Sequence, residues 1–124
     1  MKDERSILFQ HLKKLIKQYE PPFVAKNDSS SRYELWSVKD LEIAGRKRKE
    51  VYFAGVIIQS SYVGFYFMPV YAEADLKKVF KKELLATLKG KSCFHINRLD
   101  RELISQVRQA LETGYRLYRR RGWI

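Results

Sequence analysis

The sequence predicts an α+β fold, a two-layer sandwich in which an antiparallel sheet carries an N-terminal and a C-terminal helix on one face. Three observations lead to this prediction. Residues 51–71 contain no charged side chain, although 31% of all residues are charged. Long amphipathic segments lie at both ends of the chain, and shorter stretches of strand character surround the uncharged middle. With 124 residues and no repeat or linker, residues 1–124 are expected to form one domain.

The uncharged middle has the pattern of a β-hairpin. Residues 51–58 and 62–70 are rich in β-branched and aromatic side chains, and the short polar break at residues 59–61 separates them. Odd and even positions are both apolar, which predicts strands that are covered on both faces or lie centrally in the sheet. A buried helix is the alternative for such a run, but its glycines and its proline argue against one.

The two terminal segments have the spacing of amphipathic helices. The first begins after the candidate N-cap Asp3, runs to about Tyr19 and ends at Glu20-Pro21-Pro22, because a residue before proline is displaced from helical backbone angles. The second follows the candidate N-cap Asp100 and ends among arginines, which the helix dipole favours at that end. Gly114 costs ~1 kcal/mol inside this helix, which predicts close packing against the sheet as compensation.

Shorter elements complete the predicted order. Three further stretches have strand character, at residues 32–38, 41–43 and 92–97. Residues 26–31 form a polar loop. The basic residues 45–49 are compatible with a localisation or phosphate-binding patch, but a charged turn that leads into the central hairpin is the simpler interpretation. Residues 74–88 predict one or two short helices, with Gly90 at a helix C′ position.

The net charge of +11 is concentrated on the outer elements. Such a field attracts phosphates, nucleic acid or anionic surfaces, although lysine-rich helix faces that keep a small protein dissolved are the simpler interpretation. No RNP-type segment accompanies the charge. The residues that would bind a polyanion under this alternative are Lys77, Lys78, Lys81, Lys82, Arg116, Arg119 and Arg120.

No stretch has the roughly 18 uninterrupted apolar residues of a membrane span, so no membrane partner is expected. The first residues carry charges of both signs and no apolar signal region. The single cysteine, Cys93, has no intramolecular disulfide partner. These features predict a reducing, cytoplasmic location.

Cys93 and His95 are two residues apart on a predicted strand, so their side chains share one face. A thiolate beside an imidazole is what a cysteine nucleophile needs, and both groups bind metals. Two such ligands do not complete a zinc shell, and a buried thiol beside a hydrogen-bonded imidazole is the simpler interpretation. We therefore expect no metal, no cofactor and no catalytic residue. A cysteine-based enzyme remains the third hypothesis, which slow alkylation of Cys93 would exclude.

Aromatic side chains exceed what the core of so small a sheet requires. Core packing is the simpler interpretation, but some of them are predicted to line a pocket on the sheet face without helices. The residues assigned to this ligand-binding hypothesis are Trp36, Tyr66, Met68, Tyr71, Cys93 and His95. The hypothesis expects Trp36→Ala or Tyr66→Ala to abolish ligand binding without unfolding the domain.

Three segments carry a resemblance to a known family. They are Tyr66-Phe67-Met68-Pro69-Val70-Tyr71, Gly90-Lys91-Ser92-Cys93-Phe94-His95-Ile96 and Tyr118-Arg119-Arg120-Arg121-Gly122-Trp123. From about Tyr33 onward the chain resembles the YdhG-like family of unknown function, which comprises small bacterial domains. The resemblance implies a frataxin-like fold, with two helices packed on an antiparallel sheet.

One branch of that family has been linked to iron handling in the manner of frataxin, which uses an acidic ridge on its first helix and sheet edge. The first helix here offers three carboxylates against five cations, and a net charge of +11 weighs against an iron chaperone. The leading hypothesis is a non-enzymatic module that binds a small or anionic ligand, or a protein partner, on the aromatic sheet face. The alternative is binding of nucleic acid or another polyanion through the basic helices.

Overall fold

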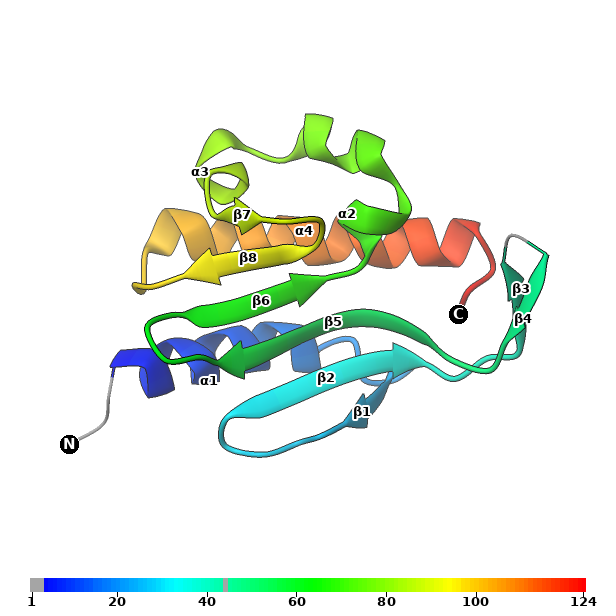
Figure 1. Cartoon of the computed structure of the whole chain (residues 1–124), viewed down its shortest axis with the longest axis horizontal. Helices are drawn as coiled ribbons and strands as arrows, with labels where there is room; N and C mark the ends of the chain where they lie inside the picture. Colours follow the sequence, from blue (N-terminus) through cyan, green and yellow to red (C-terminus); the bar gives the residue numbers. More distant parts are fainter. Residues whose placement is uncertain (1–3, 44) are drawn as a thin grey trace.

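The computed structural model describes residues 4–43 and 45–124, so the proposed N-cap Asp3 lies outside the described residues. The chain forms two layers, as Figure 1 shows: two long helices, α1 (Glu4–Lys17) and α4 (Arg101–Arg120), lie behind an antiparallel sheet. The predicted α+β sandwich is therefore confirmed, with both helices on one face of the sheet. No helix in the described ranges is both long enough and apolar enough to cross a membrane.

The main sheet has six strands in the order β1-β2-β5-β6-β8-β7, and every neighbouring pair is antiparallel. Its strands are β1 (Val24–Lys26), β2 (Arg32–Ser37), β5 (Val51–Ile58), β6 (Val63–Phe67), β8 (Cys93–Ile96) and β7 (Leu88–Lys89). A separate hairpin pairs β3 (Leu41–Ile43) with β4 (Arg46–Arg48). The remaining elements are α2 (Pro69–Ala72), the 3-10 helix η1 (Ala74–Val79) and α3 (Lys82–Leu85).

The central strands β5 and β6 form the predicted hairpin, and they lie in the middle of the sheet rather than under cover on both faces. A β-bulge explains why β5 is apolar at odd and even positions. Leu35 pairs with Ala54 and Trp36 pairs with Tyr52, so Phe53 is the extra residue between them. Phe53 and Ala54 are both fully buried, which continuous alternation along the strand would not allow.

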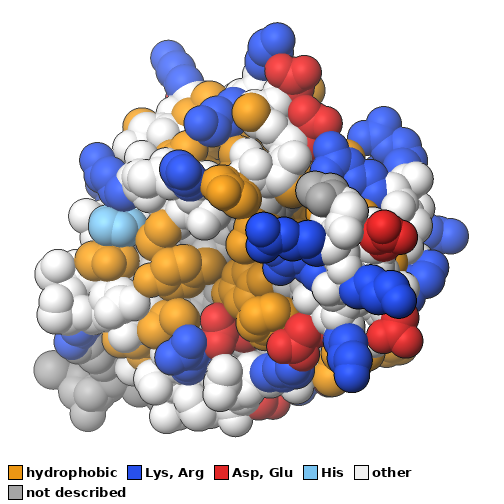
Figure 2. All heavy atoms as spheres, turned by 45° about the vertical axis from the view of Figure 1, so that its right-hand side comes forward, with side chains coloured by type: hydrophobic (Ala, Val, Ile, Leu, Met, Phe, Trp, Pro, Cys, Tyr) orange, Lys and Arg blue, Asp and Glu red, His pale blue; other side chains and the backbone are white. Residues whose placement is uncertain are grey.

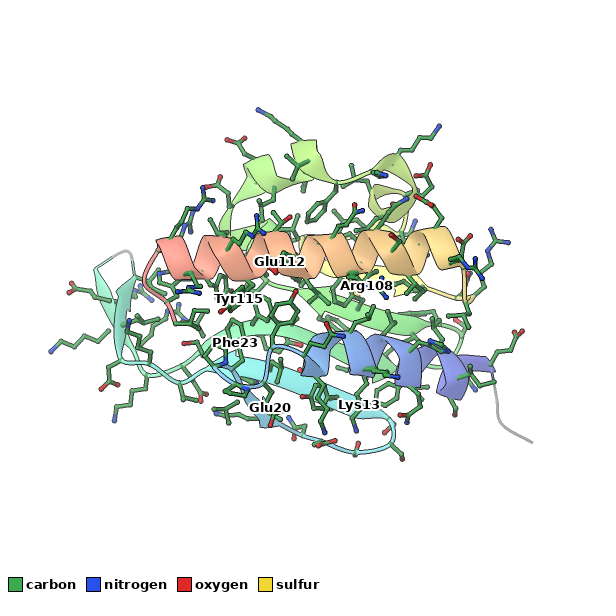
Figure 3. The ribbon with its side chains drawn as sticks, turned by 180° about the vertical axis from the view of Figure 1, so that it is seen from behind. Lys13, Glu20, Phe23, Arg108, Glu112 and Tyr115 are labelled. Carbon is green, nitrogen blue, oxygen red and sulfur yellow. The ribbon has the colours of Figure 1, made fainter. Side chains whose placement is uncertain are left out.

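The helix layer packs on the sheet through apolar stripes at helical spacing. In α1 the buried side chains are Leu8, Phe9, Leu12, Leu15 and Ile16. Seen from behind in Figure 3, α1 and α4 lie side by side, and Tyr115 of α4 is close to Phe23, with ring centroids 6.3 Å apart. The predicted cap of α4 is confirmed, because Asp100 accepts hydrogen bonds from the backbone N–H groups of Glu102 and Leu103.

Gly114 brings α4 close to the sheet. A methyl group at this position would lie 2.5 Å from Cζ of Phe67 and 2.8 Å from Cγ of Pro69. These distances are shorter than a carbon–carbon contact allows, so a side chain larger than hydrogen does not fit without displacing its neighbours. The close packing predicted for this glycine is confirmed.

Several predicted boundaries differ from the observed ones. The edge strands β1 and β7 were not predicted, because two or three residues show no periodicity. The second strand of the central hairpin ends at Phe67 rather than continuing to residue 70, because Pro69 begins a helical turn. Gly90 is not a helix C′ residue, since α3 already ends at Leu85. It takes a positive φ of 73° in the turn between β7 and β8.

Candidate functional site

Among the described residues, no helix covers one face of the main sheet, and Figure 1 shows this face toward the viewer. We call it the open face. Cross-strand pairs place Trp36 beside Tyr52 and Tyr66 beside Cys93 on it, with His95 two residues further along β8. Figure 2, turned by 45° from Figure 1, shows hydrophobic side chains gathered in the middle of the surface, with lysine and arginine around them and most densely at the right.

Two glycines determine how the tyrosines lie on the open face. A Cβ atom at Gly64 would be 2.7 Å from the ring of Tyr66, and one at Gly55 would be 2.0 Å from the hydroxyl of Tyr52. Both side chains therefore lie down on the sheet over a position that has no side chain of its own. The open face is thus covered by aromatic rings that are held close to the backbone.

Glu34 is a buried carboxylate on the same face, with an exposed fraction of 7%. It accepts hydrogen bonds from Nε of Arg32 at 2.8 Å and from the amide of Asn27 at 3.0 Å. Burial acts to raise the pKa of Glu34, but the hydrogen bonds from Arg32 and Asn27 and the nearby Tyr52 hydroxyl outweigh it and leave this pKa lowered. The negative charge of Glu34 is therefore compensated by Arg32 and stabilised by the hydrogen bond from Asn27.

Cys93 and His95 share the open face, as predicted, but they do not form a nucleophile–base pair. The imidazole of His95 stacks on the ring of Tyr62 at 3.8 Å between centroids, and no hydrogen bond joins it to Cys93 in the described part of the chain. Burial raises the pKa of the Cys93 thiol, which keeps it protonated at neutral pH and lowers its reactivity. Among residues 4–43 and 45–124, no three His, Cys, Asp or Glu side chains gather in a way that could hold a metal ion.

A pocket of about 400 Å³ lies at the end of the open face, lined by residues of the β3–β4 hairpin, the sheet and the C-terminal segment. Its walls come from β2, β5, the turn into α2, the β3–β4 hairpin and the segment after α4. The lining residues are Trp36, Ile43, Arg48, Glu50, Val51, Tyr52, Met68, Tyr71, Ala72, Arg121 and Trp123. We call this cavity the aromatic pocket.

The end of α4 places Trp123 in the pocket wall. Gly122 follows the helix with a φ of 73°, a conformation that glycine adopts readily. The N–H of Gly122 donates to the carbonyl of Arg119 at 3.0 Å, and the N–H of Trp123 donates to Tyr118 at 2.8 Å. This pair of bonds is the Schellman pattern, which turns the chain back over the helix. The Ser37 hydroxyl also donates to the carbonyl of Trp123 and ties the segment to β2.

The helical turn α2 supplies Tyr71 and is itself fixed to the sheet. The backbone N–H of Met68 donates to the carbonyl of Phe53 at 3.0 Å, and the N–H of Tyr71 donates to Met68 at 2.9 Å. Tyr71 is 56% exposed, and the ammonium group of Lys91 lies 5.5 Å from its ring centre. On the opposite wall, the indole N–H of Trp36 is buried without an acceptor among the described residues. Such a group costs about 1–3 kcal/mol.

Three charged residues line the aromatic pocket, and two of them are paired. Arg121 donates to the carboxylate of Glu73 at 2.9 Å and lies 5.0 Å from the Trp123 ring. Glu50 accepts a hydrogen bond from Lys26, whose ammonium lies 5.2 Å from the Trp36 ring. Arg48 is exposed, and no carboxylate within the described ranges lies at ion-pair distance from it.

The structure therefore divides the six predicted site residues into two groups. Trp36, Met68 and Tyr71 line the aromatic pocket. Tyr66, Cys93 and His95 lie on the adjoining part of the open face and do not contribute to the pocket wall. The sequence did not assign Tyr52, Arg48 and Trp123 to this pocket, because they reach it through a β-bulge, a separate hairpin and a helix end.

The seven cations of the polyanion hypothesis are exposed and belong to two parts of the fold. Lys77, Lys78, Lys81 and Lys82 lie in or beside η1 and α3, whereas Arg116, Arg119 and Arg120 lie on α4. Three of them have carboxylate partners: Lys78 with Asp75, Lys81 with Glu102, and Arg116 with Glu112. These pairs reduce the charge that the two surfaces offer to an anion.

Fold and site together define an α+β domain with one uncovered sheet face that ends in an aromatic pocket. Comparison of the chain with protein-family models, with curated proteins and with solved structures finds no match.

Proposed function

We propose that the protein is a non-enzymatic binding module, related to the YdhG-like and frataxin-like domains, that holds a small ligand in the aromatic pocket. The observation that supports this most is the pocket itself, in which Trp36, Tyr52, Tyr71 and Trp123 converge from four separate parts of the chain. Its volume of about 400 Å³ falls within the range of small-molecule sites.

The chemistry of the walls favours a ligand with a flat apolar body. Aromatic rings bury large areas and prefer stacked or edge-to-face contacts with other rings. Met68 adds a flexible thioether that adapts to irregular shapes. The protonated thiol of Cys93 and the stacking of His95 on Tyr62 support binding rather than covalent catalysis on the adjoining face. The single cysteine supports a reducing, cytoplasmic location as part of this proposal.

Tryptophan fluorescence tests the proposal, because both tryptophans of the chain, Trp36 and Trp123, line the pocket. Hydrocinnamyl alcohol, an uncharged phenyl compound, serves as the probe, and we expect a saturable change in the emission. Tyr71→Ala should weaken binding about tenfold through loss of ring contacts. Because Tyr71 is 56% exposed, this variant should keep the stability of the native domain.

The control is Tyr62→Ala, which removes an aromatic ring from outside the pocket, where it stacks on His95. This variant should bind the probe as the native protein does. A native protein that shows no saturable change with the probe would contradict the proposal. So would a Tyr71→Ala variant with unchanged affinity. If Tyr62→Ala abolished binding, the site would be the open face around His95 instead.

The second candidate function is binding of nucleic acid or another polyanion through the basic helix faces. It is favoured by the net charge of +11 and by the exposure of all seven assigned cations. It predicts affinity for a short oligonucleotide that falls steeply as salt rises, since phosphate contacts release counterions. Lack of binding at ~0.15 M salt would exclude it.

A further inference from the structure

The charges around the aromatic pocket are not balanced. Of its three charged lining residues, Arg121 is paired with Glu73 and Glu50 is paired with Lys26. Each of these pairs sums to zero. Arg48 is left with a full positive charge, so the lining and its partners carry one uncompensated cation.

The surroundings of Arg48 keep this charge available. It lies at the end of β4, where it pairs across the hairpin with Leu41, and its exposed neighbours Lys47 and Lys49 are also cations. Asp40 and Glu42 line a hollow on the same hairpin together with Arg48, but neither forms an ion pair with it. Arg48 lines both this hollow and the aromatic pocket, and an arginine side chain ends in a planar fork of hydrogen-bond donors.

We infer that the ligand of the aromatic pocket is an amphipathic anion: an apolar, ring-containing body with a carboxylate or phosphate head group that Arg48 binds. This rests on the proposed function, because it names the chemical class of ligand for the same cavity. The guanidinium donates two parallel hydrogen bonds to the head group, and the aromatic walls hold the body. A ligand of the opposite charge meets an unpaired arginine and is repelled.

Three probes of matched shape test the inference by tryptophan fluorescence: hydrocinnamate, hydrocinnamyl alcohol and hydrocinnamylamine. They share one phenylpropyl body and differ only in the terminal group. We expect the carboxylate to bind about tenfold more tightly than the alcohol, as a charge-assisted hydrogen bond permits. The amine should bind more weakly than the alcohol. Phenylpropyl phosphate, measured in parallel, distinguishes a carboxylate site from a phosphate site by which anion binds more tightly.

Arg48→Gln should lower the affinity for the carboxylate about tenfold, to that of the alcohol. A saturable change with the alcohol then shows that the pocket still binds in the variant. Lys47→Gln is the matched control, since it removes the same charge from the adjacent residue, which does not line the aromatic pocket. This control should retain most of the preference for the carboxylate.

Each result has one meaning. If the alcohol binds and the carboxylate binds no better, the anion inference is wrong and the proposed function stands. If no probe binds, the proposed function is wrong. If Lys47→Gln removes the preference as fully as Arg48→Gln does, the preference comes from the general positive field and Arg48 has no specific role.

Discussion

Glu34 illustrates how a single residue in this protein depends on its neighbours. Its carboxylate is buried on the open face and is held by Arg32 and Asn27. Asn27 lies in the loop after β1 with a φ of 59°, a left-handed conformation that asparagine adopts more readily than most residues. The loop therefore turns so that the Asn27 amide reaches the carboxylate.

The lowered pKa of Glu34 predicts how stability depends on pH. Because the folded-state pKa lies below the ordinary value of 4.5, the charged form contributes stability above that value and loses it as the pH falls through the folded-state pKa. Glu34→Gln should therefore lower the free energy of unfolding by about 1–3 kcal/mol at neutral pH. The difference from the native protein should shrink at acid pH, as the pH falls below 4.5 and through the lowered pKa and the native carboxyl group also becomes protonated.

Urea unfolding at both pH values measures this difference. Glu42→Gln is the control, an exposed carboxylate on β3, and it should change the free energy of unfolding by less than about 0.5 kcal/mol. An equal loss of stability for Glu34→Gln at neutral and acid pH would show that packing of the side chain, and not its charge, stabilises the fold.

At the scale of elements, α4 does more than cover the sheet. Its N-terminus is capped by Asp100, and the buried Gln106 accepts a hydrogen bond from the backbone N–H of Leu84 at 2.9 Å, which fixes α3. Tyr118 donates from its hydroxyl to the carbonyl of Tyr52 at 2.6 Å. The helix thus joins α3, the bulged strand β5 and, through Gly122, the pocket residue Trp123.

Gly114→Ala tests how closely α4 packs on the sheet. Alanine would favour the helix by ~1 kcal/mol over glycine. Its methyl group, however, would lie 2.5 Å from the ring of Phe67, which is fully buried and has no room to move away. Overpacking of this kind costs about 1–3 kcal/mol, so we expect a net loss of stability in urea unfolding. Gln109→Ala, at an exposed site of the same helix, should be nearly neutral. A stabilised Gly114→Ala variant would mean that the packing is looser than described.

At the scale of the whole molecule, one aromatic cluster joins the two layers. Phe53 of the bulge stacks on Phe23 with a centroid distance of 4.1 Å, and it also contacts Tyr19, Phe67 and Tyr118 edge to face. Tyr19 and Phe23 come from the segment after α1, Phe67 from the neighbouring strand and Tyr118 from α4. The bulge therefore places its extra residue where both helices meet the sheet.

Phe53→Ala should be among the most destabilising substitutions in the chain. Removing a fully buried phenyl ring leaves a cavity and typically costs about 3–5 kcal/mol. Val79→Ala is the surface control, since Val79 is 66% exposed, and its effect should be close to zero. Chemical unfolding followed by far-ultraviolet circular dichroism measures both. A loss below about 1 kcal/mol for Phe53→Ala would contradict a core centred on this residue.

The fold was largely predictable because its main elements are specified by the spacing of apolar residues and by a helix-capping residue. The apolar stripes of α1 and α4, the cap Asp100 and the uncharged hairpin each express a local physical preference, and the structure confirms them. The edge strands β1 and β7 were missed because a strand of two or three residues is too short to show an alternation of apolar and polar side chains. Gly90 was misassigned because a positive φ is needed in a strand turn as well as after a helix.

The candidate site was predictable only in part. Trp36, Met68 and Tyr71 were assigned to the ligand-binding hypothesis from the excess of aromatic residues, and all three line the aromatic pocket. Tyr52 and Trp123 could not be found in this way. Tyr52 reaches the open face through a bulge, and Trp123 reaches the pocket through the turn at Gly122 and a hydrogen bond from Ser37.

The sequence by itself determined that this protein has two amphipathic helices on one face of an antiparallel sheet, because the hydrophobic period of each segment is a local property. Only the tertiary structure decided which side chains share a cavity and which charges remain unpaired. Arg48 and Trp123 line the same pocket although they lie far apart in the chain. Whether a cation is neutralised depends on carboxylates that other elements bring to it, and no local pattern contains that information.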